Sequence, residues 1–120
     1  SSLSEPDKDE ILKKITREME VNGYYAKNLA SLSDLAKQLN ETPHHVSQVI
    51  NERLNKSFFE LLAFYRVEKA KEIIAGDREG KITIEELAEL VGYNSKSSFN
   101  TVFRKLTSLT PSEFRKSLHK

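Results

Sequence analysis

The sequence predicts an all-α fold of about seven helices, built as two helix-turn-helix units joined by a long helix. Apolar residues recur at three- and four-residue intervals, in short clusters that each fill one face of a helix. The 120 residues include only four glycines and three prolines, which leaves little chain for sheet turns or flexible linkers. A chain of this length forms one domain of ordinary size.

The composition argues against several classes of protein. The chain has no cysteine, so it can form neither a disulfide framework nor a thiolate zinc site, and we expect a cytoplasmic location. No apolar run approaches the roughly 18 to 20 residues that cross a bilayer, so we expect no membrane contact by this segment. The sequence contains no glycine-rich phosphate-binding loop and no recognisable catalytic triad of serine, histidine and aspartate. We therefore expect that the protein is not an enzyme, has no catalytic residue and binds no cofactor or metal.

Charge is distributed unevenly along the chain. The formal net charge of +1 is low for a protein that binds nucleic acid. Residues 79–95 hold four glutamates against one lysine. Residues 96–120 hold a single glutamate, Glu113, against six cations: Lys96, Arg104, Lys105, Arg115, Lys116 and Lys120. The positive field therefore lies at the end of the sequence where we place a recognition helix, meaning the second helix of a helix-turn-helix unit.

Local signals predict the helices of the first half. The first helix covers about residues 6–20, with Pro6 and an acidic first turn at its start. The polar residues 31–34 begin a second helix, and Thr42-Pro43 begins a third as an N-cap followed by proline. The third helix turns one apolar face inward, made of Val46, Val49 and Ile50. Its outer side carries His44, His45, Ser47, Gln48 and Asn51.

The second half begins with the longest predicted helix. Ser57 and Glu60 form a capping box, and the helical pattern continues until Gly76, over about 18 residues or roughly 27 Å. Another capping box at Thr83 begins a helix that Gly92 ends. Asn94 or Ser95 can cap the next helix, and Thr110-Pro111 opens a last short one. We expect the inward face of the helix after Ser95 to consist of Phe99, Val102, Phe103 and Leu106.

The chain repeats itself internally. Leu35-Ala36 followed by Val46 and Ile50 reappears as Leu87-Ala88 followed by Phe99 and Phe103. In each copy the small alanine lets two helices cross closely, and asparagine or glycine permits the turn between them. The spacing from alanine to the first apolar residue of the next helix is one residue greater in the second copy. The sequence thus predicts a duplicated helix-turn-helix whose second turn is one residue longer.

One set of residues resembles a known family: Leu35-Ala36, Ser57-Phe58, Tyr65-Arg66, Ala70, Ile84, Ala88, Gly92-Tyr93, Ser98-Phe99, Phe103-Arg104, Thr110-Pro111 and Phe114-Arg115. Over about residues 32–117 this string is similar to the DNA-binding domain of AraC/XylS-type bacterial transcription regulators. The resemblance implies sequence-specific binding of double-stranded DNA and regulation of transcription. It also implies that two recognition helices enter successive major grooves, about one turn of DNA apart.

The same resemblance gives the expected organisation and partners. The chain is expected to be one DNA-binding domain, the C-terminal part of a longer protein whose effector or signalling domain is not present in this segment. Besides DNA, RNA polymerase is an expected partner. The expected segments are an N-terminal helix and lead-in (1–31), the first helix-turn-helix (32–56), the linker helix (57–76), and the second helix-turn-helix with the C-terminal helix (77–120).

The family's base-facing positions fall on the outer sides of the two recognition helices. On the first they are His44, Ser47 and Gln48, and a glutamine can pair bidentately with adenine. On the second they are Lys96, Ser97, Asn100 and Thr101, where lysine suits guanine or phosphate and asparagine suits adenine. Contacts to the DNA backbone are expected from helix N-termini and cations, at Ser57, Ser95, Arg104 and Lys105.

Several neighbouring residues have other readings. His45 suits a solvated or phosphate-touching role as well as a base contact, and adjacent histidines on a helix do not form a metal site because they do not face one another. Arg66 lies on the linker helix and favours an internal ion pair, whereas Arg115 stays undecided. The phenylalanines at 58, 99, 103 and 114 lie on apolar stripes and are expected in the core.

The sequence departs from the family pattern at three turns. Asn40, Asn55 and Ser108 stand where glycine is common. Asparagine tolerates left-handed backbone, while a serine there predicts a tighter or mildly strained turn. The first unit is also electrostatically neutral, because its three cations balance three acids: Lys37, Arg53 and Lys56 against Asp34, Glu41 and Glu52. An alternative function is therefore a helical protein-interaction domain that keeps this fold but has lost its affinity for DNA.

Overall fold

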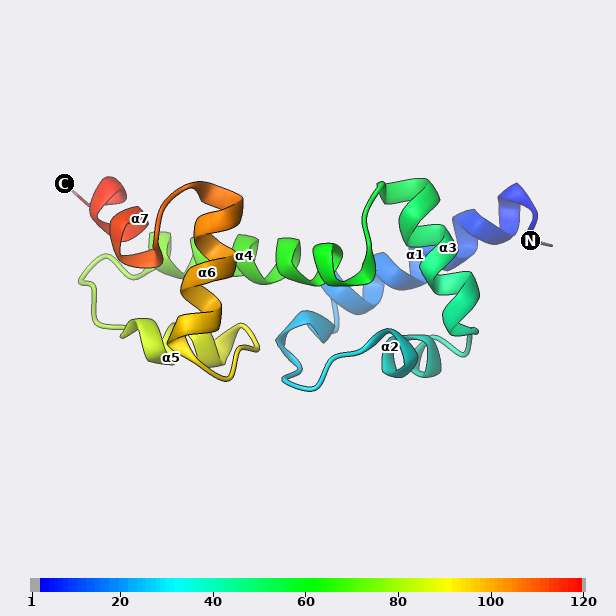
Figure 1. The fold of residues 1–120 in the computed structure, drawn as a ribbon, viewed down its shortest axis with the longest axis horizontal. Coiled ribbons are helices and arrows are strands. Elements are labelled where there is room, and N and C mark those ends of the chain that lie inside the picture. Colours follow the sequence, from blue (N-terminus) through cyan, green and yellow to red (C-terminus); the bar gives the residue numbers. More distant parts are fainter. Residues whose placement is uncertain (1–2, 120) are drawn as a thin grey trace. The chain divides into compact units, whose positions relative to one another are not determined.

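The structure is a computed structural model that describes residues 3–119. Within this range the chain forms seven α-helices, one short 3-10 helix and no strand, which confirms the predicted fold class (Figure 1). Lys120, which we counted in the basic end of the chain, lies outside the described residues. The chain divides into two compact units, an N-terminal unit (Ser1–Leu62) and a C-terminal unit (Ala63–Lys120).

The N-terminal unit contains α1 (Glu5–Glu20), η1 (Tyr24–Ala26), α2 (Leu32–Gln38), α3 (Pro43–Leu54) and the first turn of α4 (Phe58–Gly76). Side-chain caps fix these helix starts. Ser4 closes a capping box with Asp7, so α1 begins one residue before the predicted position. Ser31 accepts a hydrogen bond from the amide of Asp34, and Thr42 accepts one from the amide of His45.

The core of the N-terminal unit forms where α1, α2 and α3 meet. Its fully buried side chains come from all three helices: Ile15 and Met19, then Leu35 and Ala36, then Val46, Val49 and Ile50. Helix α1 contacts α3 directly and is also fastened to the turn that precedes it. The ammonium of Lys14 lies 2.7 Å from a carboxylate oxygen of Glu41 and donates to the carbonyl of Leu39 at 3.2 Å. Helix α1 therefore supports α3 and the turn that precedes α3.

Tyr24 in η1 holds the start of α2. Its hydroxyl donates to a carboxylate oxygen of Asp34 at 2.8 Å and accepts a hydrogen bond from the amide of Ser31 at 3.2 Å. Burial raises the pKa of Tyr24 to about 12, so the hydroxyl remains a donor at neutral pH. The lead-in to the first helix-turn-helix is thus fixed by a buried phenol.

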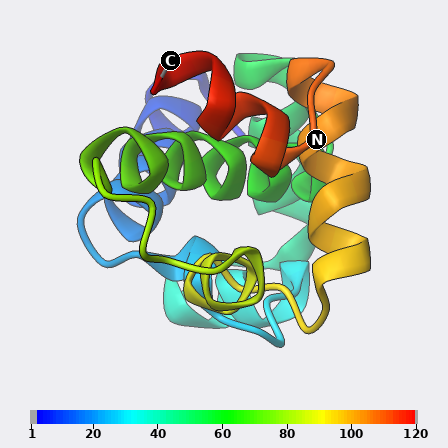
Figure 2. The same cartoon turned by 90° about the vertical axis from the view of Figure 1, so that its left-hand side faces the viewer.

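The C-terminal unit contains the rest of α4 together with α5 (Ile84–Leu90), α6 (Lys96–Thr107) and α7 (Pro111–Leu118). Thr83 and Thr110 close the predicted capping boxes of α5 and α7, and Ser95 rather than Asn94 caps α6. Figure 2 shows α6 running from α5 at one end to α7 at the other, beside the second half of α4. The long helix α4 has 19 residues and includes Gly76, close to the predicted extent.

Aromatic rings fill the core of the C-terminal unit. Phe99 and Phe103 are completely buried, and their ring centroids lie 5.7 Å apart. Phe103 also contacts Phe114 of α7 at 5.5 Å, edge to face. The expectation that Leu106 faces inward was wrong, because this side chain is 50% exposed. It lies in the last turn of α6, beyond Phe103, the last buried α6 residue of the core.

The predicted duplication appears in backbone geometry. Asn40 and Gly92 have positive φ angles of 57° and 102° in the two turns. The amide that follows each of them, in Glu41 and in Tyr93, donates to the carbonyl of the buried alanine five residues earlier at 2.9 Å. The N-caps Thr42 and Ser95 then follow at spacings that differ by one residue, as the sequence predicted.

The loop between α4 and α5 is closed by one carboxylate. Asp77 accepts hydrogen bonds from the amides of Lys81 at 3.1 Å and Ile82 at 2.9 Å, and these bonds lower the pKa of Asp77 below its usual value. Arg115 of α7 approaches Asp77 at 3.9 Å and donates to the carbonyl of Ile82. The loop therefore fixes the entry to α5 and attaches α7 to it.

Ser108 has a left-handed backbone with a φ of 69°. Serine adopts this region less readily than asparagine, so the conformation costs free energy. We expect Ser108→Gly to raise the free energy of unfolding by about 0.5 to 1 kcal/mol. The matched control is Ser112→Gly in the first turn of α7, which should lower it by several tenths of a kcal/mol, since glycine is a poor helix former. Urea denaturation measures both, and equal losses in the two variants would contradict a left-handed Ser108.

The contribution of Asp77 to the stability of the fold depends on pH. The folded-state pKa of Asp77 is depressed, so its contribution to stability is present above the unfolded pKa of about 4 and is lost as pH falls through the folded value. Asp77→Asn should therefore be less stable than the parent at pH 7, with a difference that narrows below about pH 4. Thermal unfolding across this pH range provides the measurement. A constant difference at all pH values would show that the charge of Asp77 is not involved.

Candidate nucleic-acid interface

Helix α6 places its polar residues on one side and its phenylalanines on the other. Ser95 caps the helix, accepting from the amide of Ser98 at 3.1 Å. Phe99 and Phe103 are anchored in the core, which fixes the rotation of α6 about its axis. The opposite side is exposed and carries six polar or charged residues, namely Lys96, Ser97, Ser98, Thr101, Arg104 and Lys105. The predicted base-reading residue Asn100 is half-buried at the edge of this side.

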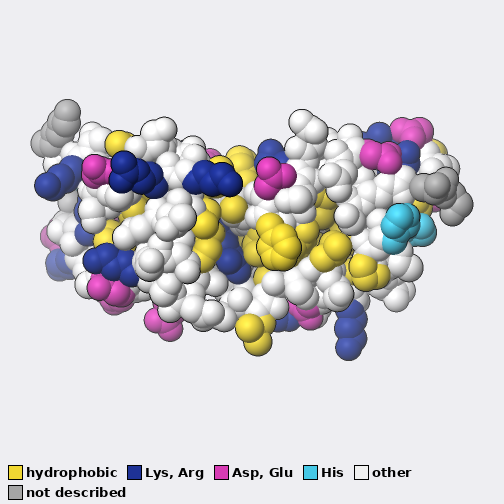
Figure 3. All heavy atoms as spheres, viewed as in Figure 1, with side chains coloured by type: hydrophobic (Ala, Val, Ile, Leu, Met, Phe, Trp, Pro, Cys, Tyr) yellow, Lys and Arg dark blue, Asp and Glu magenta, His cyan; other side chains and the backbone are white. Residues whose placement is uncertain are grey.

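The electrostatics of α6 are those of an anion-binding surface. The helix contains three cations and no acidic residue between Lys96 and Thr107. Figure 3 shows lysine and arginine side chains over the face of the C-terminal unit on which α6 lies. The ammonium of Lys96 lies 3.9 Å from a carboxylate oxygen of Glu85, and both side chains are at least half exposed. An exposed pair of this kind is weak and leaves the lysine available to a phosphate.

Two hydroxyls on this side of α6 are already engaged locally. The Thr101 hydroxyl donates to the backbone carbonyl of Ser97 at 3.0 Å. The Ser95 hydroxyl donates to the side-chain hydroxyl of Ser98 at 3.1 Å. Each hydroxyl retains lone pairs, so it can still accept a hydrogen bond. Ser95 caps α6, and its position at the helix N-terminus suits an anion.

Helix α3 exposes a different set of groups. His44 is exposed in its first turn, while His45, Ser47 and Gln48 are half-buried. The rings of the two histidines lie 6.0 Å apart and tilted, and no cluster of three metal-ligating side chains occurs among the described residues. Figure 3 shows histidine on the same face as α3 within the N-terminal unit. The three predicted base-reading residues thus lie on α3 with unequal access to solvent.

Gln48 lies one turn before Glu52 on α3. Lys8, and after it the side-chain amide of Gln48, lower the pKa of the Glu52 carboxyl below its usual value. The amide oxygen of Gln48 is buried and has no hydrogen-bond partner.

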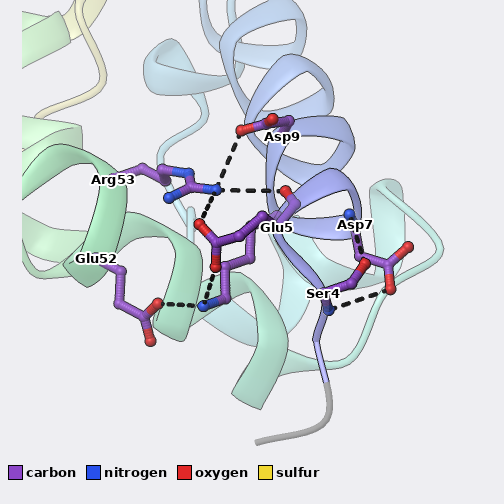
Figure 4. Close-up of polar contacts among 7 residues, drawn as sticks. Ser4, Glu5, Asp7, Asp9, Glu52 and Arg53 are labelled. Atoms are coloured by element: carbon purple, nitrogen blue, oxygen red, sulfur yellow. Dashed lines mark hydrogen bonds and ion pairs between the residues drawn. The ribbon is translucent and has the colours of Figure 1, made fainter.

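Glu52 and Arg53 connect α3 to the first turns of α1 (Figure 4). The ammonium of Lys8 lies 2.8 Å from Glu52 and 3.0 Å from Glu5. Arg53 lies 2.9 Å from a carboxylate oxygen of Glu5 and 3.2 Å from one of Asp9. These contacts lower the pKa of Glu5 and of Glu52 and raise that of Lys8, because each charged form gains an opposite charge.

This network was not predicted from the sequence. From the sequence alone, the acidic first turn of α1 indicates a favourable interaction with the helix dipole, and Glu52 and Arg53 contribute only to the neutral charge of the first unit. The signal that could have revealed it is the spacing of Glu5, Lys8 and Asp9, which places all three on neighbouring turns of one helix face. Their partners on α3 could not be identified without the packing of α1 on α3.

The remaining candidates divide between the surface and the interior. Ser57 caps α4 by accepting from the amide of Glu60 at 3.1 Å and is exposed. Arg66 is 7% exposed, and its guanidinium lies 4.7 Å from the ring centroid of Tyr93, so an aromatic ring is one of its partners. Arg115, undecided from the sequence, is committed to the α4–α5 loop. Neither arginine belongs to the exposed side of α6.

Among the described residues, no helix combines the length and the apolar character needed to cross a bilayer. The family model for a helix-turn-helix domain matches residues 35–117. The chain is 31% identical over 94 residues, or 78% of its length, to YpdC, an uncharacterized HTH-type transcriptional regulator of Escherichia coli (strain K12). It spans only 32% of YpdC and 11% of YtdP, a similar regulator of Bacillus subtilis (strain 168) that is 28% identical.

Solved structures share the fold over nearly the whole chain. The C-terminal domain of AraT, a response regulator from Geobacillus stearothermophilus, is 28% identical with a TM-score of 0.76, covering 98% of this chain and 88% of that one. The DNA-binding domain of AdpA, solved in complex with a target DNA, has a TM-score of 0.74 and covers 89% of this chain and 90% of its own. At 14% identity the likeness to AdpA is one of fold alone.

Two capped helix-turn-helix units, one of them with a cation-bearing and acid-free second helix, define the helix-turn-helix class of DNA-binding domains. The family model covers well over half of the chain. This chain belongs to the AraC-type family of helix-turn-helix DNA-binding domains of transcription regulators.

Proposed function

We propose that this domain binds specific sites in double-stranded DNA, with α3 and α6 reading bases in successive major grooves. The observation that carries the proposal is the exposed, acid-free side of α6, fixed in rotation by two fully buried phenylalanines. The length of α4, 19 residues or about 28 Å, is compatible with the roughly 34 Å repeat of the duplex. The complex of AdpA with its target DNA supports the same use of the fold.

The proposed roles follow from the chemistry of each side chain. Bases are read by His44, Ser47 and Gln48 on α3 and by Lys96, Ser97, Asn100 and Thr101 on α6. The DNA backbone is held by Ser57, Ser95, Arg104 and Lys105. Because α6 holds the exposed cations, we propose that the C-terminal unit supplies most of the attraction to phosphate. The N-terminal unit then depends more on hydrogen bonds.

The role of the longer protein is part of the same proposal. The chain spans only 32% of YpdC and 11% of YtdP, which supports a parent protein that joins the DNA-binding domain to an effector or signalling domain. A transcription regulator acts where the bacterial chromosome lies, so we place the parent in the cytoplasm and propose RNA polymerase as its second partner. The family also supports a binding function without catalysis.

The competing function is a helical protein-interaction domain without affinity for DNA, favoured by the net charge of +1 and by Glu52 on the exposed side of α3. A salt titration separates the two. We expect duplex affinity to fall steeply with salt concentration and binding to one selected site to survive competitor DNA. Fluorescence anisotropy with a site selected from random duplexes measures both properties. Absence of duplex binding at low salt would favour the interaction domain.

Substitutions separate base contacts from backbone contacts. Gln48→Ala and Asn100→Ala should each cost about 1 to 3 kcal/mol at particular base pairs and little elsewhere. Arg104→Ala should weaken binding to all sequences alike and reduce the salt slope by about one. Arg78→Ala, an equal change of charge in the loop outside α6, is the matched control and should change binding less. Equal losses on every sequence for Gln48, Asn100 and Arg104 would refute these assignments.

A further inference from the structure

Helices α3 and α6 are equivalent residue by residue. Each has 12 residues, follows a hydroxyl N-cap and ends at a left-handed C-cap, and the same sequence offset separates the two N-caps and the two C-caps. This register gives Asn51 on α3 the position that Arg104 has on α6, and gives Glu52 the position of Lys105. The two cations proposed to hold the DNA backbone on α6 are therefore replaced on α3 by an amide and an acid.

Asn51 has the chemistry for a phosphate contact that carries no charge. Its side chain is exposed, and its NH₂ group donates to the backbone carbonyl of Ser47, one turn earlier, at 2.9 Å. This bond uses one of the two N–H groups of the amide and leaves the other to donate. Asparagine is among the residues that commonly donate to phosphate oxygens in DNA. Because the amide is already held by its own helix, it loses little conformational freedom on binding.

Glu52 carries a charge that opposes such a contact, because a carboxylate beside Asn51 repels a phosphate. The ammonium of Lys8 on α1 lies 2.8 Å from the Glu52 carboxylate (Figure 4). The Lys8 side chain is only 13% exposed, so it has few alternative positions. The pair lowers the pKa of Glu52 and raises that of Lys8, so both groups are charged at neutral pH. Lys8 therefore compensates the negative charge at this end of α3.

We propose that Asn51 is the phosphate contact of α3, equivalent to Arg104 on α6, and that Lys8 makes this contact possible by neutralising Glu52. This inference rests on the proposed binding of duplex DNA by α3. The contact adds a hydrogen bond and no net charge, so it strengthens binding to every sequence without increasing the salt dependence. It also gives α1, which lies outside both helix-turn-helix segments, a part in DNA binding.

Two substitutions break the Lys8–Glu52 pair with opposite changes of charge. Lys8→Met leaves Glu52 uncompensated and should weaken binding of the full chain to a duplex of random sequence by about threefold at low salt. Glu52→Gln should strengthen binding, and in its background Lys8→Met should change affinity by less than about twofold. If the pair served only to fold the N-terminal unit, both single substitutions would weaken binding.

The exposed pair between Lys13 and Glu10 on the same helix provides the matched control. Lys13→Met and Glu10→Gln make the same changes of charge within α1 and should each change affinity by less than about twofold. Fluorescence anisotropy at several salt concentrations measures all of these variants. The effect of Lys8→Met should shrink as the salt concentration rises, because the charge of Glu52 is then screened.

The contact of Asn51 is tested at the phosphate itself. Asn51→Ala should weaken binding to all sequences by about tenfold with an unchanged salt slope, whereas Asn51→Arg should increase the slope by about one. In a site selected from random duplexes, single phosphates are then replaced by uncharged methylphosphonates. Replacement of the contacted phosphate should weaken binding of the parent chain and leave that of Asn51→Ala unchanged.

The outcomes are distinguishable from failure of the proposed function. Weaker binding in both Lys8→Met and Glu52→Gln, or equal shifts in the Lys13 and Glu10 variants, overturns the inference. A loss in Asn51→Ala that is confined to one base pair makes Asn51 a base reader, which also overturns the inference while the proposed function stands. If the parent chain binds no duplex at low salt, the proposed function fails and this inference fails with it.

Discussion

The orientation of each recognition helix depends on a single left-handed residue in the turn before it, Asn40 or Gly92. This conformation lets the next amide return to the carbonyl of Ala36 or Ala88, at 2.9 Å in both cases. The two alanines are 1% exposed and small enough for the helices to cross closely. Because the frame is set by backbone bonds and buried apolar contacts, the outer faces of α3 and α6 can carry different chemistry on the same scaffold.

The helix starts were predictable because their causes are local: a hydroxyl such as that of Thr42 needs only the next three residues to cap a helix. The seven helices, the repeat and the longer second turn followed from such signals. The exposure of Leu106 did not, because helical periodicity indicates which face a residue occupies but not where the core ends. The pairing of Lys8 with Glu52 joins distant parts of the chain, so it required the tertiary packing of α1 on α3.

The two recognition helices differ in whether their charged side chains are paired within the protein. On α6 the cations are exposed and the nearest acid is 3.9 Å from Lys96. On α3 the charged residues Glu52 and Arg53 form ion pairs with Lys8 and Glu5 of α1. The cations of α6 are therefore exposed while Arg53 of α3 is paired with α1, which explains how a domain of net charge +1 keeps a basic helix face in its C-terminal unit.

The attachment of α7 has a consequence for how the C-terminal unit opens. Phe114 packs against Phe103, Arg115 donates to the carbonyl of Ile82, and His119 lies 3.1 Å from the carbonyl of Ile74. Fraying of α7 would uncover a core ring and release the loop at the same moment, so these segments form one cooperative unit of local unfolding. Proteolytic removal of α7 would therefore loosen the packing that orients α6, even without a cut within α6.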